Sequence, residues 1–218
     1  MRVFATRRQL VTALPSRAVV AEIGVQRGNF SKKILRKAKP RRLHLIDCWE
    51  EHHDGLGYPH DGRPVSQTNH DDNYAFVEER FAAGIAAGRV QLHRGYSVPL
   101  LKAFPDSYFD WIYIDANHTY EAVSSELAAA LTKIKPGGVI AGHDYIDTLY
   151  WKKRNFGVVE AVDEFCGRHG WEIIAETSEP GWDVDQSDNP SYAIRQAGLR
   201  PLWYGWEAWL PFVIRRAA

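Results

Sequence analysis

The sequence of 218 residues has only two cysteines, Cys48 and Cys166, a single methionine and no long hydrophobic run. Two isolated cysteines form neither a CxxC motif nor a disulfide framework, which favours a reducing compartment. No stretch of about 18 apolar residues occurs, so no membrane span is expected. The N-terminal residues MRVFATRRQL also lack the continuous apolar segment of a secretory signal. We therefore expect a cytoplasmic protein.

An excess of charge of one sign is missing as well. The 27 Lys and Arg residues balance the 27 Asp and Glu residues, which gives a formal net charge of zero. Nucleic-acid-binding proteins usually carry an excess of basic charge, so no nucleic-acid partner is expected. Hydrophobic residues make up 45% of the chain, which excludes general disorder. The length fits a single domain over residues 1–218.

Short apolar runs alternate with segments of helical spacing. The predicted buried strands are 17–24, 43–46, 89–93, 110–114 and 139–142, and the predicted helices are 30–38, 74–85, 120–134 and 157–169. This alternation predicts an α/β fold with a doubly wound parallel sheet. Two later strand-like segments, 171–177 and 191–195, have no helix between them and must form an antiparallel hairpin. The expected sheet is therefore seven-stranded, mostly parallel, and ends in a hairpin.

Two segments depart from this pattern. Residues 49–70 are rich in histidine and glycine and lack helical or strand spacing, which predicts a long loop that acts as a lid. Trp49 and Tyr58 in this loop are candidates for lining an acceptor pocket. Residues 197–218 are rich in aromatic side chains. This tail either packs on the core, residues 17–196, or forms a subunit contact in a homodimer.

Ligands of open α/β sheets bind beyond the carboxyl ends of the strands. The residues at those ends, in strand order, are Glu22, Gly24 and Gly28; Asp47; Tyr96 and Ser97; Asp115 and His118; and His143 and Asp144. A glycine turn exposes N–H groups at a helix start, and an acid after the second strand suits a ribose diol. Both features fit an adenosine cofactor. The turn lacks the middle glycine of the dinucleotide fingerprint, which disfavours a pyrophosphate ligand.

Several motifs together resemble one family. They are E-x-G-x-x-x-G at 22–28, IDCWEEHHDG at 46–55, DWIYIDANHTYEAVSSEL at 110–127 and KPGGVIAGHDY at 135–145. This set is similar to the small-molecule O-methyltransferase branch of the class I S-adenosylmethionine-dependent methyltransferases, over residues 17–196. The resemblance implies a Rossmann-like methyltransferase fold, S-adenosylmethionine as cofactor and a hydroxyl of a small-molecule acceptor, of sugar, polyketide or glycan type.

The resemblance also implies roles for individual residues. Glu22, Gly24 and Gly28 would surround the methionine part of the cofactor. Asp47 would hold the ribose hydroxyls, and Tyr96 and Ser97 would lie near the adenine. Asp115 completes the implied cofactor-binding set.

In metal-dependent relatives, an acid after the fourth strand and an acid pair after the fifth bind a divalent ion. Here these positions are Asp115 and the pair His143-Asp144, so a histidine replaces one acid. Carboxylates favour Mg²⁺, and an imidazole shifts the preference toward Mn²⁺, Fe²⁺ or Zn²⁺. His143 and Asp144 can reach one ion only if the strand has ended, because successive strand residues point to opposite faces. Alternatively, Asp144 caps a loop and His143 packs under it.

His118 and His143 are the candidate general bases for removing the acceptor's proton. His118 has a second interpretation, in which it only hydrogen-bonds a neighbouring carboxylate. Two other function classes stay open. A metal-dependent hydrolase or oxygenase could use Asp115, His118, His143 and Asp144, and a nicotinamide-dependent oxidoreductase could use the same first turn and acid.

Overall fold

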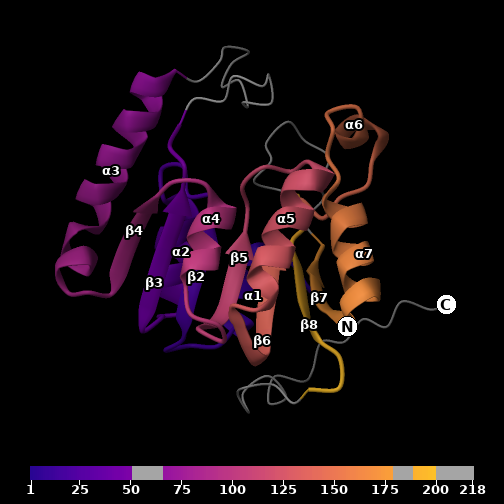
Figure 1. Ribbon diagram of the computed structural model, residues 1–218. Helices are drawn as coiled ribbons and strands as arrows, with labels where there is room; N and C mark the ends of the chain where they lie inside the picture. The colour runs from indigo at the N-terminus through magenta and orange to yellow at the C-terminus, as the bar shows by residue number, and fades with distance from the viewer. Residues whose placement is uncertain (51–65, 179–188, 200–218) are drawn as a thin grey trace.

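The computed structural model describes residues 1–50, 66–178 and 189–199. Its strands are β1 (Arg2–Phe4), β2 (Val19–Ile23), β3 (Arg42–Asp47), β4 (Val90–Arg94), β5 (Phe109–Ile114), β6 (Ile134–Gly142), β7 (Trp171–Thr177) and β8 (Tyr192–Gln196). They form one eight-stranded sheet in the order β1-β7-β8-β6-β5-β2-β3-β4 (Figure 1). Of these strands only β8 runs antiparallel to its neighbours, β6 and β7. The doubly wound, mostly parallel sheet with a terminal hairpin is thus confirmed.

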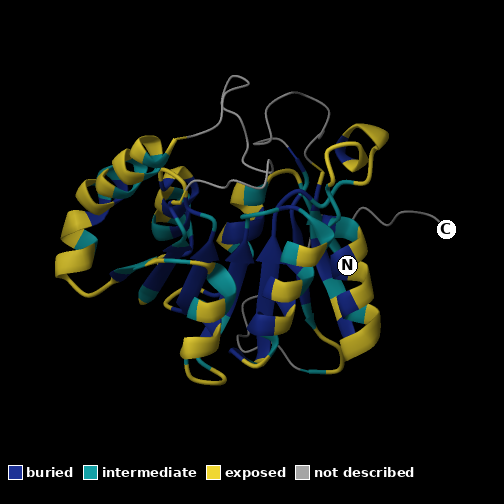
Figure 2. Cartoon of the chain, turned by 45° about the horizontal axis from the view of Figure 1, so that its top comes forward, coloured by how far each residue is buried: buried dark blue, intermediate teal, exposed yellow. Residues whose placement is uncertain are grey.

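Helices cover both faces of the sheet. One face carries α1 (Arg7–Ala13), α2 (Asn29–Lys37) and α3 (Gln67–Ala86), and the other carries α4 (Ser97–Ala103), α5 (Tyr120–Leu131) and α7 (Val158–His169). The short α6 (Leu149–Lys152) lies in the connection between β6 and α7. Figure 2 shows that buried residues concentrate in the sheet, between the two helical layers.

The central strand β5 is apolar on both faces, as a parallel strand between two helical layers must be. Trp111 and Tyr113 pack in the cluster with α1 and α2, and Ile112 and Ile114 pack in the cluster with α4, α5 and α7. Because β5 lies between β2 and β6, the residues that follow these three strands emerge side by side at one edge of the sheet.

The sheet has one strand more than the seven that the sequence predicts, and the additional strand is β1. Arg2–Phe4 pairs in parallel with Ala175–Thr177 of β7 and places the start of the sheet upstream of residue 17. The three residues of β1 are all half-buried, so they carry no alternation of apolar and polar side chains. A strand this short is defined by its backbone pairing with β7, and its side chains give no pattern from which it could be predicted.

One helix prediction extended too far. The apolar spacing from Tyr120 predicted a helix through Ile134, but α5 ends at Leu131 and Ile134 opens β6, paired with Phe109. Ile134 packs in the same apolar cluster as the buried face of α5. Helical spacing therefore does not distinguish the last turn of this helix from the first residue of the strand that follows.

The predicted lid, residues 49–70, is described only at its two ends. Trp49 is 1% exposed, and its Nε1 donates a hydrogen bond to the Gln26 carbonyl, so it is a core residue rather than part of an open acceptor pocket. Gln67–His70 form the first turn of α3, with Ser66 as the N-cap, rather than loop. Residues 51–65, with Tyr58, lie outside the described residues, as do residues 200–218 of the aromatic tail.

Cys48 and Cys166 do not form a disulfide with each other. Within the described ranges, no helix combines the length and the apolar character that crossing a membrane requires.

Candidate active site at the carboxyl end of the sheet

A glycine turn after β2 brings two loops into close contact. Gly24 has φ +84°, and a Cβ atom at this position would lie 1.9 Å from the carbonyl oxygen of Asp115. Gly28 has φ +68° and forms the N-cap of α2, with no capping side chain among the described residues. The first-turn N–H groups of α2 are thus left to water or to a ligand. At position 24 only glycine allows the loops after β2 and β5 to approach each other this closely.

Asp47, at the end of β3, holds the glycine turn in shape. Its Oδ2 accepts hydrogen bonds from the backbone N–H groups of Val25 and Gln26, at 2.7 and 2.8 Å, and its Oδ1 accepts one from Trp49 at 2.9 Å. An ionised carboxylate offers about four acceptor positions. A ribose hydroxyl would therefore share Asp47 with the turn, a double role that the sequence did not predict.

Glu22 is a buried acid two residues before the glycine turn. Burial raises its pKa to about 8; a hydrogen bond with Ser31 and the nearby Arg7 oppose this, while Asp115 and Asp47 add to it. In the described part of the chain, its Oε2 has no hydrogen-bond partner. A neutral carboxyl at this position would ionise more readily beside a cationic ligand, which fits the sulfonium and ammonium charges of the expected cofactor.

Tyr96 and Ser97 follow β4, as the sequence indicated. Tyr96 is exposed, and the Ser97 hydroxyl donates to Oε1 of Glu126 on α5 at 2.6 Å. Burial raises the pKa of Glu126 to about 7, and this hydrogen bond partly offsets the effect. Ser97 therefore links the start of α4 to α5, and the expected contact of both residues with the adenine stays a prediction.

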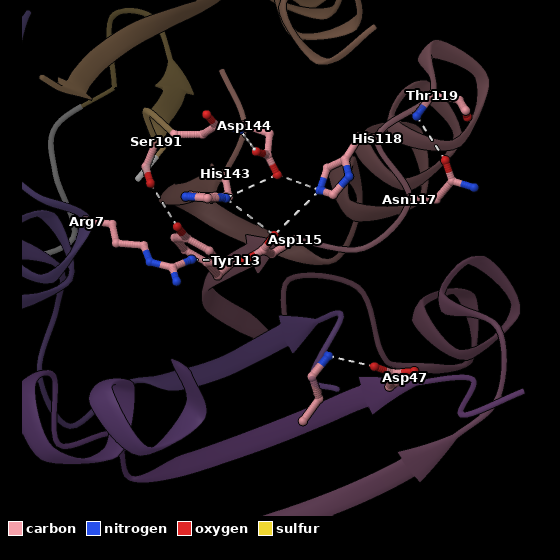
Figure 3. Close-up of polar contacts among 12 residues, drawn as sticks. Arg7, Asp47, Tyr113, Asp115, Asn117, His118, Thr119, His143, Asp144 and Ser191 are labelled. Atoms are coloured by element: carbon pink, nitrogen blue, oxygen red, sulfur yellow. Dashed lines mark hydrogen bonds and ion pairs between the residues drawn. The ribbon is translucent and has the colours of Figure 1, made fainter. Parts of the chain in front are cut away.

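Four polar side chains converge beyond β5 and β6 (Figure 3). Nε2 of His118 lies 2.6 Å from Oδ2 of Asp144 and 3.6 Å from Oδ1 of Asp115. Nδ1 of His143 lies 3.1 Å from Oδ2 of Asp144 and 3.7 Å from Oδ1 of Asp115. The sequence thus predicted the members of this cluster, which is called the carboxylate–imidazole cluster below.

The end of β6 explains how consecutive residues join one cluster. The strand ends at Gly142, and Asp144 has φ +57°, a conformation that a non-glycine residue rarely adopts. His143 and Asp144 can therefore both turn toward Asp115, which a continuing strand would forbid. Strained backbone of this kind is often found at functional sites.

His118, His143 and Asp144 are buried, and the charge state of Asp144 depends on both imidazoles. Burial alone would raise the pKa of Asp144, but the imidazoles of His118 and His143 outweigh it and hold that pKa well below its usual range. Asn189, just before β8, donates its Nδ2 to Oδ1 of Asp144 at 2.5 Å. The His118 ring stacks on Phe156 with centroids 4.8 Å apart. Asp144 is thus held in place as an anion.

Two contributors were missed by the sequence reasoning. Nη1 of Arg7, in α1, donates to Oδ2 of Asp115 at 3.2 Å, and Asn189 contacts Asp144 as described above. Neither residue belongs to a motif: Arg7 comes from α1, which packs on the same face of the sheet as α2, and Asn189 directly precedes β8, which pairs with β6. No sequence signal could have identified them.

Three members of the cluster lie close enough together that they could hold a metal ion. Ligand atoms of Asp115, His118 and Asp144 all lie within 4.8 Å of one another. Two carboxylates and one imidazole are a donor set that suits Mg²⁺, Mn²⁺ or a later transition ion. The sequence suggested His143 as the third ligand, whereas this group contains His118. A ligand role for His143 stays a prediction.

Sequence comparison identifies this region with a known domain. A family model described as "Methyltransferase domain" matches residues 21–145, more than half of the chain. The match begins in β2 and ends just beyond Asp144, so it spans the glycine turn and the carboxylate–imidazole cluster. A comparison with curated proteins finds no significant match.

Solved structures with the same fold include several methyltransferases. The O-methyltransferase from Bacillus cereus in complex with SAH is 16% identical, with a TM-score of 0.57, over 87% of this chain and 78% of the other. The N-methyltransferase NodS from Bradyrhizobium japonicum WM9 is 13% identical, with a TM-score of 0.58, over 87% and 94%. A protein named as an rRNA-methylase from Clostridium thermocellum is 12% identical, with a TM-score of 0.57, over 87% and 94%. At sequence identities this low, the similarity shows that the fold is shared and nothing beyond that.

Proposed function

The chain belongs to the methyltransferase domain family and is an S-adenosylmethionine-dependent methyltransferase, and on this basis we propose that it methylates a hydroxyl group of a small molecule in the cytoplasm. The acceptor is of sugar, polyketide or glycan type. The one observation that carries this proposal is the convergence of two carboxylates and two imidazoles beside the glycine turn. A hydroxyl acceptor needs such groups, because its proton must be removed when the methyl group arrives.

The cofactor is bound along the ends of β2, β3 and β4. Glu22, Gly24 and Gly28 surround its methionine part, Asp47 accepts a ribose hydroxyl, Tyr96 and Ser97 lie near the adenine, and Asp115 completes the set. The buried Oε2 of Glu22 and the uncapped start of α2 support this assignment. The sulfonium of S-adenosylmethionine supplies an electrophilic methyl group, and the protein's part is to align the acceptor oxygen behind it.

The carboxylate–imidazole cluster removes the acceptor's proton. His118 is the first candidate for the base, because Asp144 fixes its imidazole from 2.6 Å and Phe156 fixes the plane of its ring. His143, which contacts the same carboxylate oxygen, is the second candidate. A divalent ion, held by Asp115, Asp144 and either His118 or His143, would lower the pKa of the hydroxyl and fix its position.

Calorimetry with S-adenosylmethionine, S-adenosylhomocysteine and NAD tests the cofactor. Micromolar binding of the first two, about −7 to −8 kcal/mol, is expected, with no binding of NAD. Tight NAD binding without either methyl-donor compound would favour an oxidoreductase instead. Labelled S-adenosylmethionine should then transfer its methyl group to members of a panel of hydroxylated sugars and polyketides, and not to RNA transcripts. Labelling of RNA alone would contradict the small-molecule acceptor.

A homodimer through the aromatic tail is the remaining part of the proposal. Light scattering on the full chain and on a chain that ends at residue 199 would test it. The full chain is expected to have a mass near twice 24.8 kDa, and the shortened chain is expected to be a monomer. A monomeric full chain would contradict it.

A further inference from the structure

Arg7 brings a permanent positive charge to a site that contains several carboxylates. It is the first residue of α1, and its side chain is 13% exposed. Nη1 donates to Oδ2 of Asp115 at 3.2 Å, and the guanidinium carbon lies 4.5 Å from the centre of the Phe30 ring. Figure 3 shows the side chain reaching from its helix toward the carboxylate–imidazole cluster. Arg7 therefore lies between the end of β5 and the start of α2.

These two contacts place Arg7 next to the glycine turn. Phe30 is the second residue of α2, just after Gly28, and the carbonyl of Asp115 is the group that a Cβ atom at Gly24 would strike. The guanidinium thus lies against both elements that flank the turn. The contact with Phe30 helps to hold the guanidinium in place, and its five N–H donors form a fork that matches a carboxylate.

The ligand that the turn is proposed to hold carries a carboxylate of its own. The methionine part of S-adenosylmethionine has one ammonium and one carboxylate group. Glu22, Asp47 and Asp115 surround this region with potential negative charge, which would repel the ligand's carboxylate unless a cation is present. Arg7 can supply this cation, because its guanidinium already forms an ion pair with Asp115.

We propose that Arg7 is the residue that binds the carboxylate of the amino-acid part of S-adenosylmethionine. This inference rests on the proposed cofactor site. Arg7 and Asp115 pair with each other, and when the ligand binds they pair with the opposite ends of its zwitterion. The carboxylate accepts from the guanidinium, and the ammonium lies beside Asp115. Helix α1, which lies upstream of the matched family region, thereby supplies part of the cofactor site.

Calorimetry with two ligands isolates this contact. S-Adenosylhomocysteine carries the carboxylate, and its decarboxylated analogue keeps the adenosine, the sulfur and the amine but lacks it. Arg7→Met should weaken binding of S-adenosylhomocysteine about 10- to 100-fold and change binding of the analogue less than about threefold. The wild-type protein should prefer S-adenosylhomocysteine by a similar factor, and Arg7→Lys should fall between the two. Arg8→Met, at the next and exposed position of the same helix, is the matched control and should bind both ligands as wild type does.

The outcomes separate this inference from the function on which it rests. No binding of S-adenosylhomocysteine to the wild-type protein would contradict the cofactor site itself. Equal affinity of the wild-type protein for both ligands would contradict only the role of Arg7, even if Arg7→Met failed to fold. An equal loss of both ligands in Arg7→Met would mean that Arg7 only supports the fold. Unchanged binding of both ligands, with a raised KM for a carboxylated acceptor, would assign Arg7 to the acceptor and overturn the proposal.

Discussion

Nε2 of His118 lies 2.6 Å from Oδ2 of Asp144, and both side chains are almost completely buried. The two residues come from the ends of different strands, β5 and β6, and nothing in their sequence separation of 26 positions brings them together. The positive φ of Asp144 turns its carboxylate toward His118. This pair, with Asp115, is where the proposed proton removal or metal binding must occur.

Asp144→Asn should reduce methyl transfer about 10²- to 10⁴-fold, because it removes the anion that orients His118 or binds the metal. Affinity for S-adenosylhomocysteine should change less than about threefold, since the adenosine contacts lie on other strands. Turnover with an accepted substrate and calorimetry measure the two quantities. Asp147→Asn, the same change at an exposed position three residues later, is the control. Equal loss of binding and turnover would contradict this separation.

Chelation should reproduce the effect of Asp144→Asn if the cluster holds an ion. Turnover is measured before and after treatment with chelator and after add-back of Mg²⁺, Mn²⁺ and Zn²⁺. Recovery with one of these ions is the expected result. Full activity in chelator would exclude the metal, and His118→Gln and His143→Gln would then separate the two candidate bases.

Asp47→Ala should weaken S-adenosylhomocysteine binding by about 1.5–3 kcal/mol, the usual effect of losing hydrogen bonds to a charged group. Part of this loss has an indirect cause, because Asp47 also accepts from the backbone of Val25 and Gln26 and shapes the glycine turn. Asp47→Asn, which keeps one acceptor oxygen, should lose less. Asp72→Ala, exposed on α3, is the control for a lost surface charge. An Asp47→Ala variant with wild-type affinity would rule out the ribose contact.

Gly24→Ala should lower the free energy of unfolding by roughly 3 kcal/mol or more. The new Cβ atom would lie 1.9 Å from the carbonyl oxygen of Asp115, and φ +84° adds backbone strain. Gly88→Ala has a similar positive φ, but nothing lies within 4 Å of its Cβ position. It should cost only about 1–2 kcal/mol, the strain alone. Urea denaturation compares the two variants, and equal costs would mean that the close approach at Gly24 is unimportant.

The buried, neutral state of His44 should make the protein less stable in mild acid. Burial lowers its pKa from 6.5 to about 3, helped by His93 and Arg42. Its two ring nitrogens contact Nε2 of His93 at 2.9 Å and the Tyr108 hydroxyl at 3.2 Å. Below about pH 6.5 the unfolded chain therefore takes up a proton at His44 that the folded protein does not, and the free energy of unfolding falls as the pH drops toward 3.

His44→Phe should remove this contribution. Between pH 7 and pH 5 the wild-type protein should lose roughly 1–2 kcal/mol more stability than the variant. Urea denaturation at both pH values measures the difference. His169→Phe, at an exposed position of α7, is the control. A wild-type protein whose pH dependence matches that of His44→Phe would contradict the neutral, buried state of His44.

The elements around the site could be predicted because each is a short buried apolar run followed by a polar turn. β5, with Trp111 and Tyr113 on one face and Ile112 and Ile114 on the other, is the clearest case. Asp115, His118, His143 and Asp144 were located by their place after two such runs. A contact of His118 with a carboxylate was one of the two interpretations, but that both imidazoles contact the same oxygen of Asp144 could not be predicted, because Asp144 adopts a positive φ that its residue type does not require.

The contributions of Arg7 and Asn189 could not be predicted for a different reason. Asn189 reaches the site through the antiparallel pairing of β8 with β6, and Arg7 reaches it from α1, the helix that follows the short strand β1 and packs on the same face of the sheet as α2. Backbone pairing leaves no side-chain pattern in a strand as short as Arg2–Phe4. A single sequence therefore shows which residues follow the central strands, but it does not show which residues next to the outer strands reach the site.

The position of β8 has a consequence for the synthesis of the protein. Although β8 is the last strand in the described part of the chain, it lies between β6 and β7, and Asn189 just before it holds Asp144. A chain emerging from the ribosome can form β2 to β6 in order, but β6 and β7 remain separated by an empty position until residues 189–196 arrive. A chain that ends before residue 189 would therefore carry the family motifs without the hydrogen bond from Asn189 that holds Asp144.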